Sequence, residues 1–143
     1  MSITNGGNIV RVLIADDNPV VRRVLQQLVE KQTGFEVCAS VADGDECLEY
    51  INQDRPDVIS LDLEMPRMSG RTVLMKMLER NLHLGVVVVT GLPIHDQPSV
   101  QDELRSLGAY TILSKDFSPS GNDLGLFTKN YFSALKNAAA NNR

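Results

Sequence analysis

The chain has 143 residues, an apolar share of 43%, a charged share of 22% and a formal net charge of -4. This length is typical of one domain with a sizeable core, and the acidic balance argues against a dedicated nucleic-acid surface. No apolar run approaches the roughly 20 residues that span a bilayer, and no signal peptide is visible, so we expect a cytoplasmic protein.

The first expected strand is Val10–Ala15, a nearly continuous apolar run that ends at Asp16-Asp17-Asn18-Pro19. A helix follows, because apolar residues recur at the i, i+3, i+4 and i+7 positions of one helical face. These residues are Val21, Val24, Leu25 and Leu28. A second strand is expected over Phe35–Val41, and a second helix stops before Pro56.

The third expected strand is Asp57–Leu61, and a loop then leads into a third amphipathic helix. The most strand-like run is Val86–Thr90. Pro93 and Pro98 are expected to break the chain before a fourth helix, and Tyr110–Leu113 is the fifth strand. The last helix is expected to carry Leu124, Phe127, Tyr131 and Leu135, and the final Asn-Asn-Arg is expected to fray.

Five strand–helix units with short connections predict a parallel sheet with helices on both faces. We therefore expect one doubly wound α/β domain over residues 10–139, with an N-terminal extension over 1–9 and a tail over 140–143. Cys38 and Cys47 have apolar neighbours and are expected to be buried thiols, not a disulfide or a zinc site.

Polar residues follow the carboxyl ends of four strands. Asp16 and Asp17 follow the first strand, Asp62 the third and Lys115 the fifth, while Thr90 ends the fourth. Ligands of an open α/β sheet bind at this edge. Taken singly, the Asp pair is typical of a helix cap, and a lone Thr or Lys of a structural or surface position. Their joint occurrence at four strand ends favours a functional site.

Two carboxylates about 4 Å apart repel each other by roughly 4 kcal/mol at an effective dielectric near 20. Three converging aspartates would therefore protonate, separate or recruit a cation, and Mg²⁺ suits a set of carboxylate and water oxygens. Lys115 adds a positive charge and Thr90 a hydroxyl donor. An aspartate in these surroundings is equipped to accept a phosphoryl group.

Four segments resemble the receiver (CheY-like) family of response regulators in two-component systems: VLIADDNPVVRRVL, PDVISLDLEMPRMSG, VVVVTG and LGAYTILSK. The resemblance implies a flavodoxin-like, five-stranded parallel sheet with five helices and strand order 2-1-3-4-5. It identifies Asp62 as the phosphoacceptor, Asp17 as a direct Mg²⁺ ligand and Asp16 as a residue that acts largely through water. The backbone carbonyl of Glu64 would be a further ligand.

The resemblance further implies that Thr90 follows the phosphoryl oxygen in a conformational switch and that Lys115 pairs with the phosphate. Gly91 would leave room for phosphoryl donors and water. The implied cofactor is Mg²⁺, with Mn²⁺ tolerated, and the implied partners are a sensor histidine kinase and an unknown downstream protein. Nucleic acid and membrane are not expected as partners. The chain would be a phosphoacceptor with intrinsic autodephosphorylation, not an enzyme.

The segment LDLEMPRMSG most resembles the receiver half of chemotaxis methylesterases, which suggests a role in chemotaxis. No GxSxG motif or esterase half is present. A free-standing, single-domain response regulator is therefore preferred over a domain expressed alone.

Two positions depart from the family pattern. Asp116 follows Lys115 where the family usually has proline after a cis bond, and a cis bond without proline costs roughly 3 kcal/mol. The second is Ile112, where the family commonly has a Tyr or Phe switch residue. Tyr110 lies too far back on the same strand face to substitute simply.

Two other functions remain open. An atypical receiver that serves as a constitutive interaction module or phosphate sink is motivated by Ile112 and Asp116. An aspartyl phosphatase of the haloacid dehalogenase type is a remote alternative. Enzymes of that class have the nucleophilic Asp after the first strand and a second Asp two residues later, and this sequence does not have that arrangement. Here the acid pair comes first, and Glu64 stands two residues after Asp62.

Overall fold

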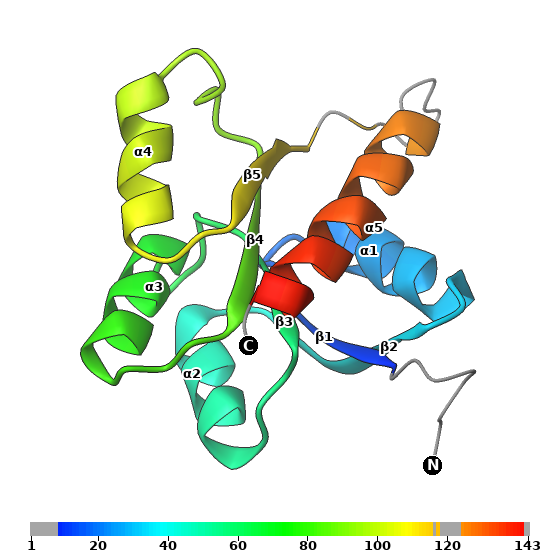
Figure 1. Ribbon diagram of the computed structural model, residues 1–143, viewed down its shortest axis with the longest axis horizontal. Helices are drawn as coiled ribbons and strands as arrows, with labels where there is room; N and C mark the ends of the chain where they lie inside the picture. Colours follow the sequence, from blue (N-terminus) through cyan, green and yellow to red (C-terminus); the bar gives the residue numbers. More distant parts are fainter. Residues whose placement is uncertain (1–8, 116, 118–123, 142–143) are drawn as a thin grey trace.

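A five-stranded parallel sheet forms the centre of the molecule (Figure 1). The computed structural model describes residues 9–115, 117 and 124–141. The strand order is β2-β1-β3-β4-β5, as expected from the resemblance. The strands are β1 (Val10–Ala15), β2 (Phe35–Val41), β3 (Val58–Leu61), β4 (Gly85–Thr90) and β5 (Thr111–Ser114).

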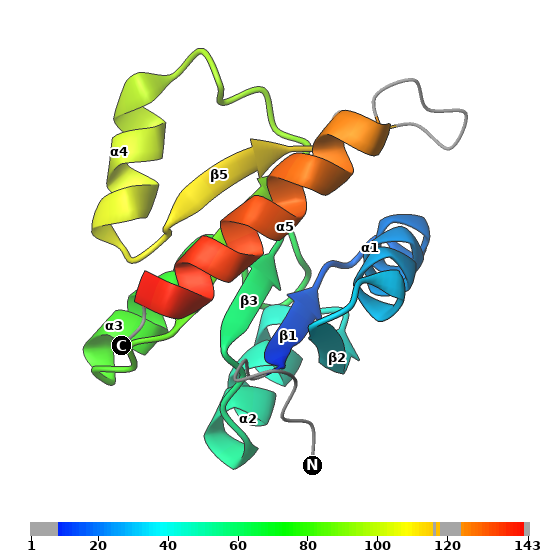
Figure 2. The ribbon, with the colours of Figure 1, turned by 45° about the vertical axis from the view of Figure 1, so that its right-hand side comes forward.

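Five helices cover the two faces of the sheet: α1 (Pro19–Lys31), α2 (Gly44–Gln53), α3 (Gly70–Glu79), α4 (Pro98–Ser106) and α5 (Leu124–Asn141). Helices α1 and α5 lie on one face, and α2, α3 and α4 lie on the other (Figures 1 and 2). None of these helices is both long enough and apolar enough to cross a membrane.

Two hydrophobic cores lie on the two sides of the sheet, and successive residues of β1 and β4 alternate between them. In β1, Val12 and Ile14 face α1 and α5, while Leu13 and Ala15 face the other three helices. All four residues are buried, at 0–1% exposure. Burial on both faces explains why the central strands are nearly continuous apolar runs, with Ser60 of β3 as a buried polar exception.

Some element boundaries differ from the expected ones. β5 begins at Thr111, one residue later than expected, and Asp57 precedes β3, where its carboxylate accepts a hydrogen bond of 2.8 Å from the Arg11 N–H. Pro98 does not break the chain but stands in the first turn of α4. Proline is tolerated there because the first N–H groups of a helix have no intrahelical acceptor.

The remaining expectations concern the C-terminus and the cysteines. Asn141 ends α5, so only residues 142–143 of the expected frayed end lie outside the described residues. Cys47 is fully buried, and burial raises the pKa of its thiol to about 12. Cys38 is partly exposed, so the expectation of a buried thiol is wrong for this residue, which lies on the edge strand β2.

Candidate metal centre

Three carboxylates meet at the carboxyl ends of β1 and β3. These strands are neighbours, and the Asp62 N–H extends their pairing by donating to the Ala15 carbonyl at 2.9 Å. One oxygen from each of Asp16, Asp17 and Asp62 lies within 4.8 Å of the others. Asp16 and Asp62 are buried, at 1% and 4% exposure, whereas Asp17 is exposed. The expected gathering of the three acids is confirmed.

The start of α1 holds Asp16 in place. The N-cap residue is Asn18, whose side-chain oxygen accepts hydrogen bonds from the first turn, so neither aspartate serves as the cap. The Asn18 N–H donates to Asp16 Oδ1 at 2.9 Å, and Arg22 donates to the Asp16 carbonyl at 2.8 Å. Neither of these two hydrogen bonds to Asp16 was expected from the sequence, although an Asn directly before Pro19 is a helix-start signal.

Gly70 closes the loop that follows Asp62. Its N–H donates to the Leu63 carbonyl at 2.9 Å, and a Cβ atom at this position would collide with the Asp62 carbonyl oxygen. The next helix therefore begins directly against the backbone of Asp62. Ser69 caps it by accepting a hydrogen bond from the Thr72 N–H.

Lys115 reaches the acids from the end of β5. Its Nζ lies 2.8 Å from Asp16 Oδ2 and 3.3 Å from Asp62 Oδ1, and its side chain is 15% exposed. Its backbone N–H donates to the Thr90 carbonyl, which continues the β4–β5 pairing. Burial by itself lowers the pKa of Lys115, but the two carboxylates outweigh burial and raise it.

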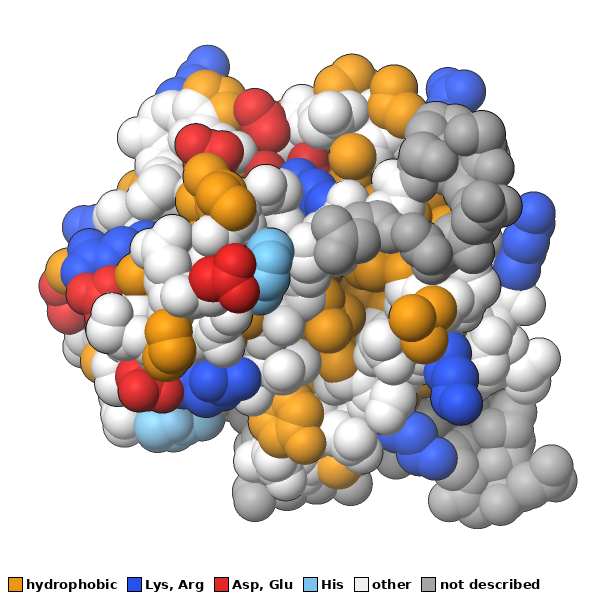
Figure 3. Space-filling view, turned by 90° about the horizontal axis from the view of Figure 1, so that it is seen from above, with side chains coloured by type: hydrophobic (Ala, Val, Ile, Leu, Met, Phe, Trp, Pro, Cys, Tyr) orange, Lys and Arg blue, Asp and Glu red, His pale blue; other side chains and the backbone are white. Residues whose placement is uncertain are grey.

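The buried acids are short of positive charge. Burial, together with the Asp16 carboxylate, raises the pKa of Asp62 to about 6, and Lys115 only partly opposes the rise. The Lys115 ammonium lies beside two of the three carboxylates, those of Asp16 and Asp62, and the side-chain atoms that the three aspartates offer to a metal are all oxygens. A hard divalent cation such as Mg²⁺ fits this set, because it prefers oxygen ligands and supplies the missing charge. Figure 3 shows acidic and basic side chains side by side at this end of the molecule.

Thr90 lies at the same edge of the sheet as the acids, but its hydroxyl contacts the β4–α4 loop. It is 1% exposed, and its Oγ1 accepts a hydrogen bond of 3.0 Å from the Leu92 N–H. Within the described residues its hydroxyl makes no hydrogen bond to Asp62 or Lys115. Glu64 contributes its N–H, 3.4 Å from Asp62 Oδ1, and its carbonyl stays a predicted ligand.

Of the two departures from the family pattern, Ile112 is among the described residues and lies near this edge. Ile112 and Thr90 both line a cavity of about 180 Å³ under the β4–α4 loop, together with His95. A Cβ atom on Gly91 would contact only Lys115 Cδ, at 3.9 Å, so there is space beside the lysine. The Lys115–Asp116 peptide bond lies outside the described residues, because Asp116 is not described.

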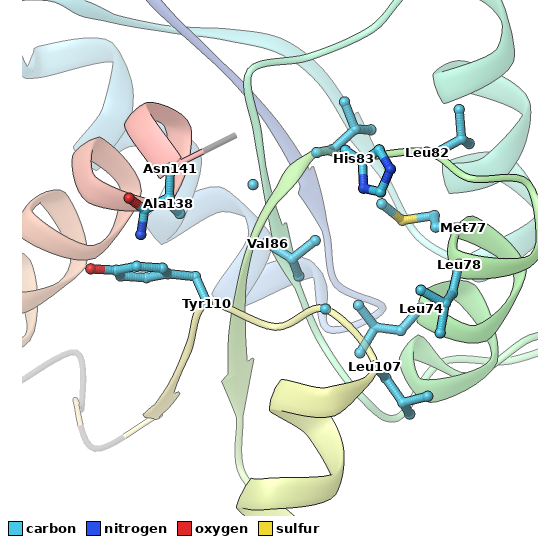
Figure 4. A pocket seen from close by; sticks show the side chains of 13 residues that line it. Leu74, Met77, Leu78, Leu82, His83, Val86, Leu107, Tyr110, Ala138 and Asn141 are labelled. Atoms are coloured by element: carbon cyan, nitrogen blue, oxygen red, sulfur yellow. The ribbon is translucent and has the colours of Figure 1, made fainter. Parts of the chain in front are cut away.

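A larger cavity, of about 460 Å³, lies at the opposite end of the sheet (Figure 4). Its walls include Leu74 and Met77 of α3, Ala138 of α5 and Tyr110, and its floor is Val86 at the start of β4. This end carries none of the expected site residues. Tyr110 is therefore remote from Thr90 and does not take the place of an aromatic residue at position 112.

Comparison with known proteins identifies similar chains. The family model described as response regulator receiver domain matches residues 12–121. A protein-glutamate methylesterase/protein-glutamine glutaminase of Pyrococcus abyssi is 30% identical over 135 residues, which are 93% of this chain and 36% of the relative. Its counterpart in Xanthomonas oryzae pv. oryzae is 38% identical over 130 residues, with 91% and 36% covered. The chain thus spans little more than a third of these curated relatives.

Solved structures show the same fold. The response regulator domain of Thermotoga maritima CheB has a TM-score of 0.82 at 24% identity, covering 93% of this chain and 98% of that one. The signal receiver domain of the putative response regulator NarL from Mycobacterium tuberculosis has a TM-score of 0.73 at 27% identity, with 90% and 98% covered.

Proposed function

Because the chain belongs to the response regulator receiver domain family of two-component systems, we propose that Asp62 accepts a phosphoryl group in a Mg²⁺-dependent reaction. The observation that carries this proposal is the group of three carboxylates at the ends of the adjacent strands β1 and β3, with the Lys115 ammonium beside two of them. Phosphoryl transfer needs positioning and neutralisation of charge above all. The fold positions the acceptor, while Lys115 and the Mg²⁺ that the carboxylates would bind neutralise charge.

The residues of the site have separate roles in metal binding and in nucleophilic attack. Asp17, Asp62 and the Glu64 carbonyl would hold Mg²⁺ directly and Asp16 through water, and the ion would neutralise carboxylate and phosphoryl oxygens. A carboxylate oxygen of Asp62 attacks the phosphorus of a phosphohistidine. The new P–O bond makes an acyl phosphate while the P–N bond breaks, and its electron pair stays on the ring nitrogen. The imidazole leaves as a neutral base, because its other ring nitrogen already carries a proton.

Lys115 is positioned to pair with the transferred group, because its Nζ already lies 3.3 Å from Asp62 Oδ1. Thr90 would donate its hydroxyl hydrogen to a phosphoryl oxygen. The hydroxyl can donate while its oxygen still accepts from the Leu92 N–H, whereas a change of χ1 that turned Oγ1 toward Asp62 would break that hydrogen bond and rearrange the β4–α4 loop. The surface of α4, β5 and α5 would then change its affinity for a partner.

The proposed phosphoryl donor is a sensor histidine kinase, and the proposed output is binding of a downstream protein. Similarity to protein-glutamate methylesterases supports a role in chemotaxis. Because the chain spans only the smaller part of those relatives, their activity and partners are not assigned to it.

A direct test uses acetyl phosphate. We expect the wild-type protein with Mg²⁺ to gain about 80 Da, the mass of one phosphoryl group, in intact mass spectra. Asp62→Asn should gain none, and Asp102→Asn, on the exposed surface of α4, should behave as wild type. An adduct on Asp62→Asn, or none on wild type, would contradict the assignment.

A receiver without a working switch is the second candidate. The cavity beside Ile112 favours it, because no Phe or Tyr is among the described residues that line that space. Such a protein would bind its partner equally well with and without beryllofluoride, a phosphoryl mimic. A switching receiver would show a change in dissociation constant. Pull-down with the mimic, followed by titration of the recovered partner, separates the two candidates.

A further inference from the structure

Helix α4 buries little of its surface against the rest of the molecule. It lies beside α3 on one face of the sheet (Figures 1 and 2). Of its nine residues, all of them described, only Leu104 is buried, and its N-cap residue Gln97 makes no side-chain hydrogen bond to the first turn. Cavities adjoin it on two sides: Gln101 lines the one of about 180 Å³, and Leu107, its C-cap residue, lines the one of about 460 Å³. So little burial leaves α4 weakly fixed.

An ion pair on the surface joins α4 to α3. Arg71 Nη2 lies 2.6 Å from Glu103 Oε2, and Arg71 Nε lies 3.3 Å from Glu103 Oε1, so the guanidinium donates to both carboxylate oxygens. These hydrogen bonds lower the pKa of Glu103 and raise that of Arg71, and both groups are charged at neutral pH. A two-point pair of this kind has a defined geometry. A displacement of one helix relative to the other therefore weakens it.

The Arg71 end of this pair is fixed to the loop that follows Asp62. Gly70, the first residue of α3, donates its N–H to the Leu63 carbonyl at 2.9 Å and lies against the backbone of Asp62. Arg71 is the next residue, and its Nη1 donates to Met75 Sδ at 3.5 Å, one turn further along α3. The ion pair thus connects α4 to the start of a helix that is packed against the phosphoacceptor.

The other end of α4 is connected to the site through the chain itself. Thr90, which is proposed to meet the phosphoryl group, ends β4, and the loop that follows it leads into α4 at Pro98. Rearrangement of this loop would displace α4 relative to α3. An interaction that is formed in the free state and lost on such a displacement stabilises the free state. The ion pair therefore opposes the rearrangement.

We propose that the Arg71–Glu103 ion pair is a latch that holds α4 in its unphosphorylated position, so that the conformational switch at Asp62 must break it. This inference rests on the proposed function of Asp62 and extends it, because it names a contact that regulates how readily the switch occurs.

The test compares Arg71→Gln, Glu103→Gln, the double glutamine variant and a charge swap, Arg71→Glu with Glu103→Arg. The swap restores the pair with reversed charges, and it suits the helix dipoles, because an acid then lies at the start of α3 and a base in the last turn of α4. Asp102→Asn is the matched control: Asp102 is an exposed neighbour on α4, and its loss changes the net charge as Glu103→Gln does. The readout is the dissociation constant for beryllofluoride at saturating Mg²⁺, measured by isothermal titration calorimetry.

We expect both single variants to bind beryllofluoride about two- to fivefold more tightly, the range typical of an exposed ion pair. A change of net charge alone would act in opposite directions in the two variants, because one loses a positive charge and the other a negative one. The double variant should bind no more tightly than the singles, since all three break the same pair. The charge swap and Asp102→Asn should both match wild type.

Unchanged or weaker binding in the single variants would overturn the inference. Effects of opposite sign in Arg71→Gln and Glu103→Gln would also overturn it, because they would show that net charge alone is responsible, and so would a charge swap that kept the tighter binding. The failure of the proposed function is recognised separately: wild type would then bind no beryllofluoride and take up no phosphoryl group from acetyl phosphate, and the latch would fall with it.

Discussion

Asp62 shows what folding does to a single carboxyl group in this protein. Burial and the Asp16 carboxylate raise its pKa to about 6, from about 3.9 in an unfolded chain. The folded state therefore binds this proton more tightly than the unfolded state does. The resulting contribution to stability is fully present below about pH 4 and is lost as the pH rises through about 6. At neutral pH and without a bound cation, the negative charges of the site repel one another and lower the stability of the folded state.

Asp62→Asn should accordingly stabilise the protein at pH 7.5 in the presence of a chelator. We expect the free energy of unfolding to rise by about 1–3 kcal/mol, the order that corresponds to the pKa shift. At pH 4 the gain should largely disappear, because the wild-type carboxyl is then protonated in the folded state. Urea unfolding at both pH values measures this, with Asp102→Asn as an exposed control. An equal gain at both pH values would show that charge is not the cause.

At the scale of elements, the site depends on where helices begin. α1 begins with the Asn18 cap that also fixes Asp16, and α3 begins at Gly70, pressed against the backbone of Asp62. Both helix starts thus set the positions of carboxylates that belong to strand ends. A residue change at a helix start is therefore expected to alter the site as well as the stability of the fold.

Gly70→Ala tests this coupling. Its Cβ would collide with the Asp62 carbonyl oxygen, so the loop must move, at a cost of about 1–3 kcal/mol. We expect slower phosphorylation by acetyl phosphate along with the lost stability. Gly125→Ala is the control, because a Cβ at this position in α5 meets no atom within 4 Å and alanine favours helices by up to about 1 kcal/mol. If both variants kept the wild-type rate, Gly70 would matter for folding alone.

At the scale of the whole molecule, the parallel sheet collects charges that are far apart along the chain. Three charged residues follow three different strands: Asp16, Asp62 and Lys115. They meet because the carboxyl ends of parallel strands all lie at one edge of the sheet. The cluster is short of positive charge, so a cation that binds only the folded state should stabilise the entire domain. Ligand binding of this kind shifts the unfolding equilibrium by mass action.

Mg²⁺ should therefore raise the unfolding temperature at pH 7.5, and at one hundred times its dissociation constant it should add about 2.7 kcal/mol. We expect the effect to be strongly reduced in Asp17→Asn, which removes the exposed member of the cluster. Differential scanning calorimetry at constant ionic strength measures the shift, with Na⁺ replacing Mg²⁺ in the reference. A similar rise in Asp17→Asn and wild type would place the ion elsewhere.

Local sequence patterns were enough to predict the five strand–helix units, because burial on both faces of a sheet and on one face of a helix leaves a local, periodic signature. The order of Asp16-Asp17, Asp62, Thr90 and Lys115 at strand ends also predicted which side chains would share an edge. The order of the strands in the sheet came from the resemblance, since periodicity does not specify which strands are neighbours.

The relations between side chains of different elements could be learned only from the assembled fold. It buried Asp16 and Asp62 but exposed Asp17, and it directed the Thr90 hydroxyl to Leu92. These outcomes depend on strand register and on how closely each helix packs against the sheet. No local pattern encodes them, because the contacting residues are far apart along the chain and meet only when the whole core is assembled.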